Sequence, residues 1–201
     1  MKDNSDLQIT AFAWQRRVFF WLFLSCLFLS VRAQQVALKT NLLYDATLTP
    51  NLGVELGVSR RGTVQLFYGF NPWKFSETKQ TRHWVLMPEY RFWTCQRFNG
   101  HFFGVHAMGG QFNVAGVKLP FGLFDELRDR RYEGRFIGGG VTYGYQWILS
   151  RHWNFEASVG VGYDYIKYKE FGCGTCGPKH ADRHRHYFGP TKAALSLSYI
   201  F

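Results

Sequence analysis

Long apolar runs are scarce in this 201-residue chain. The uncharged apolar stretch Val18–Val31 covers 14 residues, whereas a membrane-spanning helix needs about 20. No later stretch approaches that length. The chain also lacks a nucleophile elbow, a metal-protease helix motif and a phosphate-binding glycine loop. These absences exclude a bundle of membrane helices and remove the familiar motifs of several enzyme classes.

Acidic residues are few as well. The chain has 14 Asp and Glu against 24 Lys and Arg, a net charge of +10. The first 33 residues, with four basic and two acidic side chains, account for +2, which leaves +8 on the remainder. Such a surface either keeps the protein soluble or contacts the phosphates of lipopolysaccharide. A nucleic-acid partner is not expected, because the chain carries an export signal.

The export signal is predicted at residues 1–33. Arg16 and Arg17 precede the apolar run, and Val31-Arg32-Ala33 provides the small residues that a signal peptidase recognises. Cleavage before Gln34 leaves residues 34–201 as one domain. An uncleaved anchor, or lipidation at Cys26, are the alternatives.

The rest of the chain alternates with a period of two. In Trp153–Tyr165 the odd positions are apolar or aromatic, and the even positions are mostly polar or glycine. This pattern suits a strand with one face toward lipid and the other toward a polar interior. It also explains how a membrane protein can have a mean hydropathy of −0.21 with 19% aromatic residues. Eight such segments are predicted: 36–46, 51–60, 63–72, 83–94, 101–114, 134–149, 152–168 and 189–201.

The fold class predicted is therefore all-β, an eight-stranded antiparallel transmembrane up-and-down β-barrel of the smallest outer-membrane size. Short turns such as Arg61-Gly62 and Ser150-Arg151 alternate with long charged connections such as 115–133 and 169–188. Outer-membrane barrels place short turns in the periplasm and long loops outside. Both termini are thus expected in the periplasm of a Gram-negative cell, and the aromatic last residue, Phe201, is typical of this class.

Charged side chains fall on the face opposite the aromatic residues. They are expected in the lumen: Lys39, Glu55, Glu89, Arg91, Glu156 and Asp164. Opposite charges inside a narrow barrel favour a salt-bridged plug, so that open conduction is not expected. Glycines in the outer half, among them Gly69, Gly110 and Gly138, are expected to leave space there. The alternative is a catalytic site near the outer rim, built on His83, His106 or Asp164.

The last long connection contains both cysteines and histidines. Cys173 and Cys176 form a C-x-x-C pair, and His180, His184 and His186 follow. In an exported chain a local disulfide is the first interpretation. A metal site made of these cysteines and histidines is the alternative. No cofactor is otherwise expected, and Cys95 has no evident partner.

Three stretches carry a resemblance to a known family: Lys39–Glu55, Cys173–Gly177 and Tyr187–Ala194. They resemble an uncharacterised outer-membrane β-barrel family of Bacteroidales-type bacteria, a domain of unknown function often encoded near fimbrial genes. The resemblance covers essentially the whole mature chain and implies an outer-membrane barrel with surface or fimbrial partners. It implies no activity and no catalytic residues.

Three functions follow from these patterns. The expected one is a non-enzymatic outer-membrane barrel whose basic extracellular loops serve a structural or surface-assembly role. The alternatives are an enzyme that modifies lipid or lipopolysaccharide, and a small channel. A His–Ser or His–Asp pair at the rim would favour the enzyme, and a continuous wet lumen would favour the channel.

Overall fold

The computed structural model describes residues 35–74, 80–115, 131–171 and 179–201, with the backbone alone for residues 179–182. The chain divides into two units, Met1–Gln35 and Val36–Phe201, and the strands that the structure describes belong to the second. The predicted signal peptide, residues 1–33, lies outside the described residues and stays a prediction. Among the described residues, no helix is long and apolar enough to cross a membrane.

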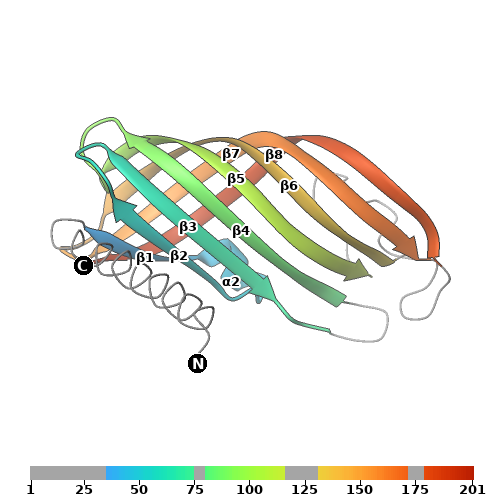
Figure 1. Ribbon diagram of the computed structural model, residues 1–201. Helices are drawn as coiled ribbons and strands as arrows, with labels where there is room; N and C mark the ends of the chain where they lie inside the picture. Colours follow the sequence, from blue (N-terminus) through green and yellow to red (C-terminus); the bar gives the residue numbers. More distant parts are fainter. Residues whose placement is uncertain (1–34, 75–79, 116–130, 172–178) are drawn as a thin grey trace, which may run out of the picture. The chain divides into compact units, whose positions relative to one another are not determined.

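Eight strands and one short helix, α2 (Leu42–Ala46), make up the second unit. The strands are β1 (Val36–Asn41), β2 (Asn51–Gly57), β3 (Gly62–Asn71), β4 (Gln80–Trp93), β5 (Gly100–Ala115), β6 (Arg131–Ile148), β7 (Trp153–Phe171) and β8 (Lys179–Ile200). Each pairs antiparallel with the next, and β8 pairs with β1, so that the sheet closes into a barrel (Figure 1). The prediction of an all-β, eight-stranded antiparallel up-and-down fold is confirmed.

The first strand is shorter than predicted. It ends at Asn41, and residues 42–46 form α2 instead of continuing the strand. The Asn41 side chain accepts a hydrogen bond from the Leu43 N–H, which is the usual way to begin a helix. Asp45 of this helix is exposed and accepts hydrogen bonds from Thr40 and Asn51.

Strand length rises steadily around the barrel, from 6 residues in β1 to 22 in β8. The strands are level at the end that carries the short turns, here called the turn end. At the other end, here called the open end, each strand from β1 to β8 extends further from the turn end than the strand before it (Figure 1). Val36 and Phe201 both lie at the turn end, where the Phe201 N–H donates to the Val36 carbonyl.

The start of β8 was predicted ten residues too late, at 189 instead of 179. The register with β7 shifts between Gly160 and Val161, so that Thr191 is left out of the ladder. Such a bulge reverses which side chains face inward. The period of two therefore breaks at Thr191, and the basic residues before it resemble a loop in the sequence.

Burial follows the alternation along each strand. The interior of the barrel holds most of the buried charged and polar residues, including Lys39, Glu55, Glu89, Arg91 and Glu156. The outer face holds large exposed apolar side chains. This is the reverse of the usual distribution in a water-soluble domain.

Candidate functional site

The candidate site is a group of six ionised side chains inside the barrel, here called the luminal charge network. They come from five strands, and each sits at an inward-facing position of its strand. The members are Lys39 of β1, Glu55 of β2, Glu89 and Arg91 of β4, Glu156 of β7 and Lys192 of β8.

Arg91 lies at the centre of the network and binds all three carboxylates. Its Nη1 donates to Glu55 Oε2 at 3.0 Å and to Glu156 Oε2 at 2.9 Å. Its Nε donates to Glu89 Oε2 at 2.8 Å. A guanidinium has five N–H donors in one plane, and this allows one side chain to hold three acceptors from separate strands.

Two lysines complete the network on either side of Arg91. Lys39 Nζ donates to Glu156 Oε2 at 2.5 Å and also forms an ion pair with Glu55. Lys192 Nζ donates to Glu89 Oε2 at 2.7 Å. The network thus ties β1, β2, β4, β7 and β8 together across the lumen.

The charges balance within the network. Three cations face three carboxylates, and all six side chains are buried or nearly so. A balanced and hydrogen-bonded set is the condition under which ions persist away from water. Removing one member leaves an uncompensated buried charge, which usually costs about 3–5 kcal/mol.

An aromatic layer closes the lumen between the network and the turn end. Trp93 and Phe102 are fully buried there, with Phe98 and Ala37 packed against them. The Arg91 guanidinium lies over the Phe102 ring at 4.5 Å from its centroid. The Trp93 Nε1 donates to Thr63 Oγ1, which in turn donates to Glu55 Oε1. The layer is therefore bonded to the network as well as packed beneath it.

A second apolar layer lies on the open-end side of the network. Phe67, Val85 and Met87 form its buried centre, and Tyr44 of α2 packs on Phe67 with ring centroids 5.2 Å apart. Met108 and Phe136 complete it. The short helix thus contributes a ring that fills the lumen, a role that the sequence did not reveal. The network is enclosed between two apolar layers.

At Gly69 and Gly110 the space expected in the outer half of the lumen is filled. A Cβ on Gly69 would lie 3.0 Å from the Tyr44 ring, and one on Gly110 would lie 2.8 Å from the Phe136 ring. The space beside these glycines is taken by aromatic side chains. The cavity that remains beside the network, bordered by Tyr44, Arg91 and Lys192, has a volume of about 50 Å³. Ligand pockets usually measure ~300 Å³ or more, so the site cannot hold a lipid or a sugar.

Asp164 is the predicted luminal charge that the structure does not bring into the network. It is buried further toward the open end, against Gly138, and its Oδ1 has no hydrogen-bond partner in the described part of the protein. Lys192 is the member that the sequence analysis missed. Lys192 alternates with the small inward-facing residues Ala194, Ser196 and Ser198 on the same strand. This alternation in the sequence could have identified Lys192 as a luminal residue.

The residues of the alternative catalytic site are dispersed. His106 is buried and shares hydrogen bonds with Thr142 Oγ1 at 2.9 Å and Thr191 Oγ1 at 3.0 Å. His83 bonds to the Thr81 carbonyl. Across residues 35–74, 80–115, 131–171 and 183–201, no hydrogen bond joins a histidine to a serine or to an aspartate.

The cysteine and histidine connection is described only in part. Cys173 and Cys176 lie outside the described residues, as does the side chain of His180, so both the disulfide and the metal site stay predictions. His184 and His186 point to the outer face, where their rings contact Tyr165. In the described residues no three His, Cys, Asp or Glu side chains could hold a metal. Cys95 is exposed and free.

Comparison with known proteins gives one match. A family model described as protein of unknown function (DUF3575) matches residues 18–201. No curated protein and no solved structure matches the chain.

Proposed function

The chain belongs to the DUF3575 family of proteins of unknown function, and we propose that it is a small integral β-barrel of the outer membrane. In this proposal it conducts no ions, catalyses no reaction and serves a structural or surface-assembly role. The turn end and both termini of the barrel face the periplasm, and the open end faces outward. The observation that carries the proposal is a charged interior inside an uncharged apolar exterior.

The uncharged exterior is continuous around the barrel and is here called the outer belt. Counted from the turn end, the outward-facing positions of the eight strands hold no Asp, Glu, Lys or Arg until Arg82 on β4, Arg135 on β6 and Lys167 on β7. Members of the belt that are about half exposed or more include Leu52, Leu66, Val105, Ile137, Val141, Val159 and Val161. Exposed apolar surface of this extent supports contact with lipid.

The height of the outer belt matches a membrane. On β7 the belt runs from Trp153 to Tyr165. Twelve residue steps of about 3.3 Å, at the usual strand tilt of about 45°, span ~28 Å, close to the ~30 Å hydrocarbon core of a bilayer. Aromatic rings cluster at its turn-end border, where Trp153 packs on Tyr199 and Tyr199 on Phe201. Aromatic girdles of this kind mark the lipid–water boundary.

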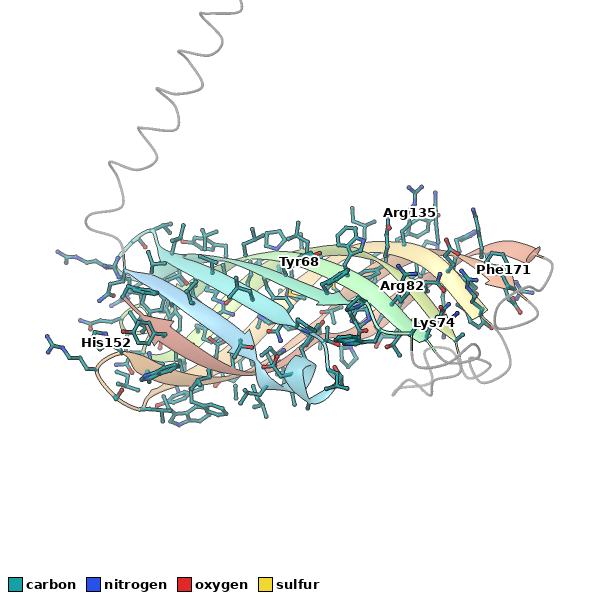
Figure 2. All side chains as sticks on the ribbon, turned by 90° about the horizontal axis from the view of Figure 1, so that it is seen from below. Tyr68, Lys74, Arg82, Arg135, His152 and Phe171 are labelled. Carbon is teal, nitrogen blue, oxygen red and sulfur yellow. The ribbon has the colours of Figure 1, made fainter. Side chains whose placement is uncertain are left out.

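Basic side chains border the outer belt at the open end. Figure 2 shows Arg82 and Arg135 toward this end and His152 at the other. A groove of about 570 Å³ on the outer face leads from apolar residues of the belt to Arg135 and Lys167. This arrangement supports lipid phosphates, including those of lipopolysaccharide, as the neighbours of the open end.

The closed lumen favours the structural role over the two alternatives. A channel needs a continuous wet path, but two apolar layers enclose the luminal charge network. A His–Ser or His–Asp pair at the lipid-facing rim would favour a lipid-modifying enzyme, and the described side chains form no such pair. Surface assembly, with fimbrial partners as the family resemblance implies, is the role that we propose for such a barrel.

Spin labels test the membrane placement. Single cysteines at Val159 and Ser158 are labelled in a variant without the native cysteines and reconstituted in liposomes. Val159 points outward and Ser158 inward on the same strand, so they form a matched pair at one depth. We expect the label at 159 to be accessible to oxygen and shielded from a water-soluble nickel complex. A label at 159 that collides freely with the nickel complex refutes the proposal.

A further inference from the structure

The groove on the outer face of the barrel lies across β4, β5, β6 and β7. Its volume of about 570 Å³ is within the range of ~300–1,000 Å³ that is usual for sites that hold a small molecule. The cavity beside the luminal charge network is far smaller, at about 50 Å³. The groove is thus large enough for part of a lipid, and it opens on the surface that we assign to the membrane.

The floor of the groove is made of small residues between larger apolar ones. Gly109 of β5 pairs with Leu86 of β4 on one side and with Ile137 of β6 on the other. Leu86 and Ile137 are both exposed and form the walls of the groove. The next outward residue of β5 toward the turn end, Ala107, is also small. Branched side chains on either side of a glycine leave an apolar slot along the outer belt.

Gly109 is a glycine that the packing of the barrel does not require. A Cβ on it would lie 3.7 Å from its nearest neighbour, the Phe136 carbonyl oxygen, and its φ is not in the left-handed region. The adjacent Gly110 differs, because a Cβ there would overlap the Trp84 carbonyl oxygen. A glycine inside a strand weakens that strand. The open space that Gly109 leaves on the outer face gives a reason for its presence.

Two cations lie side by side at the open-end border of the groove. Arg135 of β6 pairs with Lys167 of β7, and Gln111 of β5 pairs with Arg135. All three side chains are exposed and line the groove, and in Figure 2 the Arg135 side chain stands away from the ribbon. Directly opposite residues of paired strands have Cβ atoms about 5 Å apart. One phosphate can therefore contact both cations.

No carboxylate neutralises this pair of cations within residues 35–74, 80–115, 131–171 and 183–201. Lys167 Nζ lies over the Tyr165 ring, 5.4 Å from its centroid, which leaves the ammonium free of any ion pair there. The carboxylate at the next outward position of β6, that of Glu133, already forms an ion pair with Arg131 at 3.1 Å. The border of the groove thus presents positive charge to the membrane.

The charge of the site favours a phosphate monoester over a phosphodiester. A phosphate monoester carries about −1.5 to −2 at pH 7, which balances Arg135 and Lys167 together, whereas a phosphodiester carries a single negative charge. Lipid A, the membrane anchor of lipopolysaccharide, joins phosphate monoesters and acyl chains on one sugar unit. It therefore offers both chemical groups that the groove and its border can bind.

We propose that the groove binds one lipid A molecule, with a phosphate between Arg135 and Lys167 and an acyl chain along Gly109. Arginine can donate two parallel hydrogen bonds to a phosphate, and lysine adds a point charge. Burial of the chain between Leu86 and Ile137 supplies the apolar part of the affinity. The inference deepens the proposed function, because it names a lipid that the barrel retains, and it rests on that proposal for the contact of the outer face with lipid.

Native mass spectrometry of the protein purified in mild detergent tests the proposal. The probe is monophosphoryl lipid A, and the controls are the same lipid without its phosphate, phosphatidylglycerol and inorganic phosphate. We expect one lipid A per barrel and about 30-fold weaker binding of the dephosphorylated lipid, the usual effect of two basic side chains on an anionic lipid. Phosphatidylglycerol, with one charge fewer, should bind about fivefold more weakly than lipid A. Inorganic phosphate at the same concentration should not displace lipid A.

A variant that fills the groove tests the place of the acyl chain. Gly109→Leu occupies the slot and leaves both cations in place. The control is Ala157→Leu, which adds a leucine at an outward position of β7 outside the groove. We expect Gly109→Leu to bind lipid A about tenfold more weakly than Ala157→Leu, since a leucine displaces about two methylene groups of the chain. Heat-modifiable migration on gels checks that both variants fold.

A second variant tests the cations. Arg135→Gln combined with Lys167→Gln leaves the groove open and should abolish the preference for lipid A over its dephosphorylated form. The control is Arg61→Gln combined with Arg151→Gln, which removes two exposed arginines at the turn end and should keep that preference.

Three results would overturn the proposal. They are absence of retained lipid A, equal retention of dephosphorylated lipid A or phosphatidylglycerol, and equal binding by the Gly109→Leu and Ala157→Leu variants. Displacement of lipid A by inorganic phosphate at the same concentration would refute the lipid and leave a simple anion site.

The spin label at 159 separates failure of this inference from failure of the proposed function. A label shielded from the nickel complex, with no lipid A retained, refutes the groove site alone. Retention of lipid A in detergent, with a label that collides freely with the nickel complex in liposomes, refutes the membrane placement and leaves the groove site intact.

Discussion

Arg91→Met should destabilise the barrel more than any single change on its surface. The substitution removes three charge-assisted hydrogen bonds, to Glu55, Glu89 and Glu156. At about 1.5–3 kcal/mol each they sum to ~4.5–9 kcal/mol. Part of this is offset because a buried guanidinium no longer has to be dehydrated, which leaves the ~3–5 kcal/mol usual for a broken buried pair.

Urea unfolding of the folded barrel in lipid vesicles, followed by tryptophan fluorescence, measures this loss. The control is Arg151→Met, the same chemical change at an exposed position of the turn end, which should alter the free energy of unfolding by less than ~0.5 kcal/mol. Adding Glu89→Gln to Arg91→Met restores the charge balance and should recover part of the stability. A loss below ~1 kcal/mol for Arg91→Met, or a double variant less stable than the single one, would refute the reasoning.

Four further outcomes follow from the packing, the Asn41 hydrogen bonds, the lumen and the cysteine pair. Gly138→Val should prevent formation of the heat-modifiable folded species on gels, because a Cβ at this position would overlap the Asp164 carboxylate. The control, Gly109→Ala, should fold, since a Cβ there would lie 3.7 Å from its nearest neighbour, the Phe136 carbonyl oxygen. Asn41→Leu should lower the free energy of unfolding by about 2 kcal/mol, since it removes hydrogen bonds to three backbone groups; an unchanged urea midpoint would contradict this. The purified protein in planar bilayers should show no stable porin-sized conductance, and long-lived openings would argue for a wet lumen. Mass spectrometry of the unreduced, alkylated protein should find Cys173 and Cys176 joined, and two alkylated thiols with co-purifying zinc would instead identify a metal site.

The sequence predicted the inward side of most strands because that information is local. In a strand with a period of two, the face of Glu55, Arg91 or Glu156 depends only on whether its neighbours are apolar. The number of strands and their antiparallel order followed from the turns in the same way. These predictions needed no knowledge of the contacts between residues that are distant in the sequence.

The features that the sequence did not predict depend on contacts between distant segments. Tyr44 reaches the lumen because Asn41 begins a helix, and that choice is stabilised by bonds to β8, more than 150 residues away. The bulge at Thr191 conceals both the start of β8 and the inward position of Lys192. Asp164 has the predicted face, but it lies against Gly138 of β6 and outside the network, a contact that alternation does not encode.

The shortness of β1 bears on how the barrel forms and opens. β1 joins β2 by four residue pairs and β8 by five, whereas β6 and β7 share eighteen. All other neighbours are hairpins close in sequence, but the β1–β8 seam joins the two ends of the domain and carries the largest loop-closure entropy. We therefore expect this seam to close last during folding and to part first under stress. The ion pair between Lys39 of β1 and Glu156 of β7 crosses the seam inside the lumen and stabilises its closed state.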